Sequence, residues 1–513
     1  MKFAPSALLA TTCLQALSIV QGARFSARGR PRRSEASVLS KRDDAVIDLQ
    51  DMAYYVNITL SGEQYEVQID TGSSDLWVAG TVTNANNTGT QATINYAVGS
   101  DTGPIMTADM TWDGYDFTVT DQAFIQVTPS DASPEGLGLV GLGPSSGSVI
   151  YQSLNQSAAG ETPLNRIFLQ NTSEPNFITV SLGRSNFSDP DAPTEYPGDF
   201  TIGEVIPEYA NITSQPQLDV THAADSENQH WSVLLDANGV TVGNGTTFQT
   251  TTTVSQASDK SRLTFVFDSG FTLPQVPADL AKAIYGDIPG AKLVNLSDAG
   301  ESWVMSCAEE VNVTFVFGGV SIPIHPLDAT MQDPSLGNDS QCLGTFQPIS
   351  DGAAGDYDGI LGMAFLRNAY LLVNFGDFVD GNTTAKAPGY TQLLAMTDPA
   401  TAHAEFVKVR QSGQTLSSTS TLAAGDVSAS SVGQKVKMTA KKIAMIVGIA
   451  VGVLLLVLLG CCCLCCKGRG GGRYRQLNDP APMAAVDVHG HHAPATYVPY
   501  NDGQYQTAWD HRS

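Results

Sequence analysis

The sequence predicts a mostly β protein with an approximate internal repeat and one transmembrane helix near the C-terminus. Residues 51–410 hold short alternating or β-branched runs such as YEVQI, FTVTD and VNVTFVF, separated by Gly, Asn, Asp and Pro clusters typical of turns. ADLAKAIYG (278–286) is the best short helix candidate. An Asp-Thr-Gly or Asp-Ser-Gly turn follows an apolar run once in each half. Residues 443–466 form an uncharged apolar run.

The N-terminus resembles a secretory targeting segment. Lys2 precedes an apolar run at 7–20, and the small residues Gly22 and Ala23 follow, so residues 1–22 are predicted to be a signal peptide. Residues 23–42 carry seven basic residues and one acidic residue and end in Lys41-Arg42. We expect this stretch to be a weakly structured pro-peptide removed by a dibasic-specific protease, and a solvated linker is the alternative.

The run at 443–466 contains 24 residues without a charge. About 20 apolar residues are enough to cross the hydrocarbon core of a bilayer, so a transmembrane helix is predicted. A Ser/Thr-rich segment at 412–442 precedes it and reads as a stalk, and residues 467–513 follow as a polar tail. Because the apolar run is not terminal, a GPI signal is excluded.

Four Lys or Arg residues closely flank this run on each side, so their number does not orient the helix. The glycosylation sequons indicate its orientation, because all eleven precede the helix. We therefore expect a single-pass type I protein of the plasma membrane or cell surface, or of the vacuole, with a cytoplasmic tail. The sequon asparagines are Asn57, Asn86, Asn155, Asn171, Asn186, Asn211, Asn244, Asn295, Asn312, Asn338 and Asn382.

The cysteines fit this arrangement. Cys13 lies in the signal peptide, and only Cys307 and Cys342 remain in the oxidising compartment, which predicts one disulfide bond between them. The other five lie at the inner membrane boundary. We expect S-palmitoylation of at least one of them, and the alternative is that they pack there without modification. These are Cys461, Cys462, Cys463, Cys465 and Cys466.

The formal net charge of −24 is unevenly distributed. Residues 43–434 contain 10 basic and 46 acidic residues, a net charge of −36, whereas both flanking segments are basic. An acidic body of this kind excludes nucleic acid as a partner. It also offers a surface on which the basic segment 23–42 is expected to dock until it is removed.

The chemistry is concentrated in the repeat. VQIDTGSSDLWV (67–78) contains Asp70, and LTFVFDSGFTLP (263–274) contains Asp268. Each is followed later by a second Gly-containing apolar element, GLGLVGLG (136–143) or DGILGMAFLRNAYLLV (358–373). Placing a carboxylate directly after an apolar strand is costly. Its occurrence twice in matched contexts suggests two carboxylates facing each other across a pseudo-twofold axis.

These motifs resemble those of the pepsin-like (family A1) aspartic proteases over roughly residues 52–410. The resemblance implies a bilobal domain at 43–411, with an N-lobe at about 50–215 and a C-lobe at about 216–411. It identifies Asp70 and Asp268 as the catalytic pair and TINYAVGSDTG (93–103) as the flap, and it agrees with the Cys307–Cys342 spacing. The implied supporting and flap residues are Thr71, Gly72, Ser73, Trp77, Ser269, Gly270, Tyr96, Gly99 and Ser100.

Such a pair implies an aspartic endopeptidase that needs no metal or cofactor. Two adjacent carboxyl groups share one proton and activate a water molecule that attacks a peptide carbonyl, so protein substrates and an acidic pH optimum are expected. The catalytic domain is also expected to be monomeric. The dibasic site, stalk and anchor resemble those of fungal yapsin-like surface proteases. Asp101-Thr102-Gly103 is a third such tripeptide, but it follows Gly-Ser in the flap and is not expected to be catalytic.

One residue departs from the family pattern. After the second Asp-Ser-Gly the family usually has Thr or Ser, whereas this chain has Phe271. Loss of that hydroxyl is expected to raise the lower apparent pKa of the pair, and the ring is expected to crowd the neighbouring subsite. Phe271 and the dense sequons also motivate the alternative hypothesis, a non-enzymatic surface glycoprotein that keeps the fold for a binding or adhesion role.

Overall fold

The computed structural model describes residues 22–31, 52–96, 100–170, 175–184, 196–296, 300–333, 336, 340–349, 355–379 and 387–411. The predicted signal peptide up to residue 21, the dibasic site, the stalk, the apolar run at 443–466 and the tail lie outside these ranges. So do Gly99 and four of the sequon asparagines, Asn171, Asn186, Asn338 and Asn382. No helix within the described ranges is long and apolar enough to cross a bilayer.

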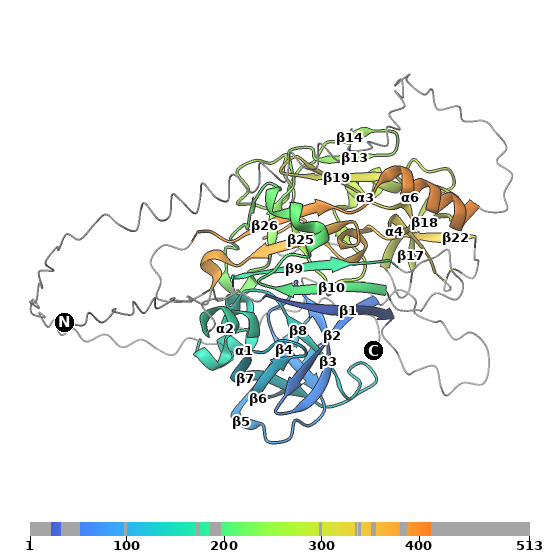
Figure 1. Ribbon diagram of the computed structural model, residues 1–513. Helices are drawn as coiled ribbons and strands as arrows, with labels where there is room; N and C mark the ends of the chain where they lie inside the picture. Colours follow the sequence, from blue (N-terminus) through green and yellow to red (C-terminus); the bar gives the residue numbers. More distant parts are fainter. Residues whose placement is uncertain are drawn as a thin grey trace, which may run out of the picture. The chain divides into compact units, whose positions relative to one another are not determined.

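The largest sheet formed by the described residues contains 13 strands from both halves of the chain (Figure 1). In spatial order they are β11 (Leu218–Asp219), β26 (Tyr390–Ala395), β25 (Ala369–Asn374), β9 (Phe177–Leu182), β10 (Tyr196–Ile202), β1 (Ala23–Pro31), β2 (Met52–Leu60), β3 (Glu63–Asp70), β8 (Leu137–Gly141), β4 (Leu76–Ala79), β7 (Thr118–Val127), β6 (Ser100–Trp112) and β5 (Asn86–Asn95).

The second half also forms three smaller sheets. The first is β12 (Ser232–Leu234), β15 (Thr264–Phe267), β24 (Gly359–Leu361), β16 (Gln275–Val276) and β23 (Gln347–Pro348). The second is β14 (Thr246–Phe248), β13 (Val240–Val242), β19 (Val313–Phe317) and β20 (Val320–Pro323). The third is β17 (Lys292–Leu296), β18 (Gly300–Ser306), β22 (Gln341–Gly344) and β21 (Thr330–Gln332).

Helices are short and lie mainly between strands. They are α1 (Val149–Ser153), α2 (Pro163–Gln170), α3 (Ala278–Tyr285), α4 (Pro326–Ala329), α5 (Met363–Leu366) and α6 (Pro399–Phe406). α3 confirms the helix predicted at 278–286. Single turns of 3-10 helix include η2 (Ser145–Gly147) and η7 (Gly376–Phe378), and a π-helical turn, η8 (Val407–Gln411), follows α6.

The two aspartates lie at the ends of strands with the same local topology. In the first half, β3 is parallel to β8, β8 is antiparallel to β4, and β4 is parallel to β7. In the second half, β15 is parallel to β24, β24 is antiparallel to β16, and β16 is parallel to β23. Asp70 ends β3 and Asp268 follows β15, so the repeat in the sequence is also a repeat of the strand pairing.

Buried apolar residues anchor both strand ends. Ile69 and Phe267, which directly precede the two aspartates, are fully buried, and Phe267 stacks on Phe365 at a centroid distance of 5.7 Å. Burial of side chains of this size contributes about 1.5–3 kcal/mol each. The carboxyl groups are therefore held by rigid strands rather than by a flexible loop.

Residues 23–31 are not weakly structured, and in this respect the expectation was wrong. They form β1, which pairs with β10 along seven residues and with β2 along four, and Figure 1 shows β10, β1 and β2 side by side. Phe25 is buried against Phe200 and Trp112, with centroids 5.6 Å apart in both pairs. The basic composition concealed this strand because its alternating small and aromatic residues are buried while Arg24 and Arg28 are exposed.

The predicted disulfide bond is confirmed. Cys307 follows β18, and Cys342 lies in β22, the strand that pairs with β18. Their Cα atoms are 4.9 Å apart, within the usual range for a disulfide.

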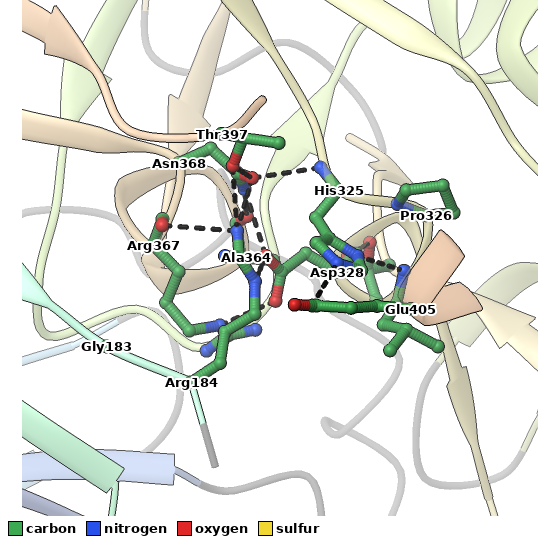
Figure 2. A network of polar contacts seen from close by, with 12 residues as sticks. Gly183, Arg184, His325, Pro326, Asp328, Ala364, Arg367, Asn368, Thr397 and Glu405 are labelled. Carbon is green, nitrogen blue, oxygen red and sulfur yellow. Dashed lines mark hydrogen bonds and ion pairs between the residues drawn. The ribbon is translucent and has the colours of Figure 1, made fainter. Parts of the chain in front are cut away.

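A buried ionic network joins the two lobes (Figure 2). Asp328 of α4 is 2 % exposed and accepts hydrogen bonds from Arg184 Nε at 2.5 Å, Arg367 Nε at 2.7 Å and Asn368 Nδ2 at 3.0 Å. Arg184 follows β9 in the first half of the chain, whereas the other three residues lie in the second half. Burial by itself raises the pKa of Asp328, but Arg184 and Arg367 together outweigh burial and hold the pKa below its usual value.

Replacing Asp328 by Asn should destabilise the protein by about 3–5 kcal/mol, because Arg184 and Arg367 would lose their buried counter-ion. Urea unfolding of the purified protein at neutral pH, followed by tryptophan fluorescence, measures this change. Asp131→Asn, at an exposed loop position, is the matched control and should change stability by less than about 0.5 kcal/mol. Equal unfolding midpoints for the two variants would contradict the assigned role of the network.

Candidate active site

The structure brings Asp70 and Asp268 into direct contact. Their carboxyl groups share a side-chain hydrogen bond. The glycines of the two motifs make this approach possible. A Cβ on Gly72 would lie 2.1 Å from Oδ2 of Asp268, and a Cβ on Gly270 would lie 2.4 Å from Oδ1 of Asp70. Each motif therefore requires glycine because the aspartate of the other motif occupies that space.

Hydrogen bonds between Thr71 and Ser269 tie the two turns together. Thr71 N–H donates to Ser269 Oγ at 3.1 Å, and Ser269 N–H donates to Thr71 Oγ1 at 2.9 Å. The two hydroxyls in turn donate to carbonyls of the opposite strand, Thr71 to Phe267 at 2.8 Å and Ser269 to Ile69 at 2.9 Å. Both residues are fully buried, so these four bonds have no competition from water.

The two aspartates have different environments. Asp70 Oδ1 accepts from Gly72 N–H at 2.8 Å, and Asp70 Oδ2 accepts from the Ser73 hydroxyl at 2.5 Å. Asp268 Oδ1 accepts from Gly270 N–H at 2.7 Å, and the Phe271 backbone N–H also favours its ionised form. No hydroxyl stands at position 271.

The surroundings of Asp268 disfavour its ionised form. Burial, the neighbouring Asp70 charge and the hydrogen bond from the shared proton together raise the pKa of Asp268 well above its usual value, and the two backbone N–H groups only partly offset this. The Phe271 ring packs with Val266, Tyr357 and Ile360 in a small apolar cluster next to this aspartate.

Tyr96 of the β5–β6 hairpin forms an aromatic pair with Trp77 of β4. Trp77 Nε1 donates to the Tyr96 hydroxyl at 2.6 Å, and both rings belong to one apolar cluster with Ile94, Ile105 and Leu139. Burial raises the pKa of Tyr96 well above its usual value, with smaller contributions from Asp101, Asp70 and Asp75, so its hydroxyl stays neutral.

The hairpin tip is only partly described. Ser100 begins β6 opposite Asn95 and is exposed, whereas Gly99 lies outside the described residues. The third Asp-Thr-Gly is not part of the pair, because Asp101 lies within β6 opposite Ile94 and accepts a hydrogen bond from the Ser133 hydroxyl.

Sequence reasoning missed two polar residues that hold the motif turns. Gln68 Nε2 donates to the Gly270 carbonyl at 3.1 Å, and His230 Nδ1 lies 2.8 Å from the Gly72 carbonyl. Gln68 could have been noticed as a polar residue between the apolar residues Val67 and Ile69, directly before the first motif. His230 carried no local signal, because it lies 158 residues from its partner.

The comparisons with known proteins agree with this geometry. The family model described as eukaryotic aspartyl protease matches residues 80–379, a range that includes Asp268 and begins after Asp70. Major aspartyl peptidase 1 of Cryptococcus neoformans var. grubii is 27 % identical over 405 residues, which cover 70 % of this chain and 75 % of that protein. An aspartic protease of Phaffia rhodozyma is 26 % identical over 389 residues, or 69 % and 82 % of the two chains.

Among solved structures, the aspartic proteinase from Irpex lacteus is similar with a TM-score of 0.50 and 16 % identity, covering 74 % of this chain and 98 % of that one. At this identity the likeness supports the fold, which is the pepsin-like bilobal fold. The family match spans more than half of the sequence and includes the second motif. The chain therefore belongs to the eukaryotic aspartyl protease family and is an aspartic endopeptidase.

Proposed function

We propose that the protein hydrolyses peptide bonds with a water molecule activated between Asp70 and Asp268. The observation that carries this proposal is the hydrogen-bonded contact of the two carboxyl groups, each seated against the glycine of the other motif. Two such groups cannot both ionise easily, so the working form of the pair holds one proton.

The unequal surroundings of the pair assign the roles. Ser73 and the Gly72 N–H stabilise a negative charge on Asp70, so Asp70 is the base. Asp268, with its raised pKa, is the acid. Asp70 takes a proton from water as the water oxygen attacks the carbonyl carbon, and Asp268 hydrogen-bonds the developing oxyanion. Collapse of the tetrahedral intermediate then breaks the C–N bond, and the amine nitrogen leaves with a proton delivered through the pair.

This mechanism restricts activity to acidic pH. Activity falls as the pH rises through the upper apparent pKa, because the pair then holds no proton, and it falls again below the lower apparent pKa, because the pair then holds two. Peptides in an extended conformation beneath the β5–β6 hairpin are the proposed substrates, with Tyr96 held in place by Trp77.

Asp70→Asn and Asp268→Asn should each reduce kcat by at least about a thousandfold, because neither variant can hold one proton and one charge on a carboxyl pair. Cleavage of denatured haemoglobin at acidic pH, with and without pepstatin, measures this. Asp101→Asn alters the third Asp-Thr-Gly and should keep activity within about threefold. Two outcomes would favour the alternative of a non-enzymatic surface glycoprotein. One is unchanged activity in both Asp70→Asn and Asp268→Asn, and the other is no pepstatin-sensitive cleavage by the wild type at any pH.

Phe271→Thr should move the alkaline limb of the kcat/KM profile to lower pH by about half to one unit. A threonine hydroxyl would stabilise the ionised form of Asp268, the group that carries the proton, so the effect falls on the upper apparent pKa rather than on the lower one. Phe271→Leu is the matched control, since it keeps apolar contact and adds no donor. Coincident profiles for the Thr and Leu variants would contradict this assignment.

We infer that residues 43–442 face the lumen or the outside of the cell and that 443–466 anchor the chain at the plasma membrane or in the vacuole. The signal-like N-terminus and the apolar run support this inference, as does the exposure of every sequon asparagine in the described residues, which an oligosaccharide requires. These are Asn57, Asn86, Asn155, Asn211, Asn244, Asn295 and Asn312.

We also infer that residues 23–42 are a pro-segment cut after Arg42. Arg24 of β1 forms a paired hydrogen-bonded ion pair with Asp199, at 2.9 Å for both contacts, and lies 3.9 Å from Glu208. These contacts support docking of the basic segment on an acidic body. Because β1 is also a strand of the largest sheet, cutting the chain is not enough to release it, and its strand pairing must be broken as well.

Deleting residues 443–466 should convert the protein from a form that stays with membranes after alkaline carbonate extraction to a secreted form. The wild type should lose apparent mass on treatment with peptide N-glycosidase F, because the sequons precede the helix. Both are read on immunoblots of fractionated eukaryotic cells, with a variant lacking the tail after residue 475 as the control that should remain membrane-bound. Recovery of the wild type in the carbonate supernatant would contradict the anchor.

A further inference from the structure

His230 joins the second lobe to the turn that carries Asp70. Its Nδ1 lies 2.8 Å from the Gly72 carbonyl oxygen, and a carbonyl oxygen can only accept, so Nδ1 carries the hydrogen. The N–H of the same Gly72 donates to Asp70 Oδ1 at 2.8 Å. A single residue, Gly72, therefore links the imidazole to the carboxyl group that acts as the base, through its carbonyl on one side and its N–H on the other.

The next residue anchors this histidine. Trp231 is fully buried, and its Nε1 donates to the Leu142 carbonyl at 2.9 Å. Leu142 N–H in turn donates to the Asp70 carbonyl at 2.7 Å. His230 and Trp231 thus hold the Asp70 turn from two sides, one through Gly72 and the other through the strand end after β8.

Three groups surround the imidazole. Tyr357 contacts it edge-on, with a centroid distance of 5.9 Å and an interplanar angle of 89°. Asp70 and Asp356 are the acidic groups that favour its protonated form. Burial is the largest influence and lowers the pKa of His230 below its usual value, while the Gly72 hydrogen bond and the two aspartates act in the opposite direction. The ring takes up a proton only when the pH falls below this lowered pKa.

We propose that His230 is a positioning residue that fixes the Gly72 carbonyl and, as an imidazolium, stabilises the ionised form of Asp70. Protonation occurs at Nε2, so the Nδ1–H bond to Gly72 persists in both charge states. What protonation adds is a positive charge near the pair, which opposes the binding of a second proton by the pair and extends activity to lower pH. The inference rests on the proposed function and adds a residue outside both sequence motifs.

The test compares kcat/KM against pH for the full-length wild type, His230→Asn and His230→Phe on an internally quenched peptide. The asparagine amide can donate where Nδ1 does but carries no charge. His230→Asn should therefore keep kcat at its optimum within about threefold and move the acid limb up by about half to one pH unit. His230→Phe keeps the contact with Tyr357 but has neither donor nor charge, and it should show the same shift with kcat reduced at least about tenfold. His222→Asn, at an exposed histidine that stacks on Phe378, is the matched control and should change neither quantity.

Thermal unfolding at the assay pH identifies a variant that fails to fold, and His230→Gln, whose amide is displaced from the Nδ1 position, then replaces His230→Phe. An acid limb that stays at the wild-type pH in His230→Asn overturns the role of the charge, and wild-type kcat in His230→Phe or His230→Gln overturns the role of the hydrogen bond. Either result, together with loss of activity in Asp70→Asn, leaves the proposed function intact. Absence of wild-type activity at every pH overturns both.

Discussion

Two carboxyl groups in hydrogen-bond contact inside a protein repel each other when both are ionised, and this repulsion is the constraint around which the molecule is organised. One shared proton relieves the repulsion. The contact between the two carboxyl groups also requires that the backbones of the two turns do not move apart. The four hydrogen bonds of Thr71 and Ser269 meet this second requirement, because each crosses from one lobe to the other. Ile69 and Phe267, the buried residues that directly precede the two aspartates, hold the strand ends in place.

The pair is symmetric in its backbone and asymmetric in its chemistry. Strand pairing repeats faithfully in the two halves, yet Asp70 has a hydroxyl partner in Ser73 and Asp268 has an apolar neighbour in Phe271. His230 increases the asymmetry, since it acts on the Asp70 side alone. A symmetric scaffold thus brings the groups together, while its asymmetric surroundings decide which of them holds the proton.

Local sequence patterns predicted the features that depend on neighbouring residues. The two motifs, the strand-rich body and α3 follow from residue types and spacing within one segment. The Cys307–Cys342 disulfide follows because these are the only two cysteines between the predicted signal peptide and the apolar run. Contacts between distant segments were not predictable in this manner. The strand at 23–31 was hidden by its arginines, His230 by its distance in the chain from Gly72, and the Asp328 network by the separation of Arg184 from the C-lobe. Nothing local distinguishes an arginine that pairs across lobes from one that faces solvent.

The acidic pH that the aspartate pair requires also destabilises the rest of the fold, because ion pairs weaken as their carboxylates gain protons. The sign of the pKa shift shows why the inter-lobe network resists this. The pKa of Asp328 is lower when folded than when unfolded, so its contribution to stability is fully present above the unfolded value and is lost only as the pH falls through the lower, folded value. The Asp268 pKa moves in the opposite direction. Between these two values Asp268 holds its proton while Asp328 remains ionised, and in that interval the protein can keep both its working dyad and the contact between its lobes.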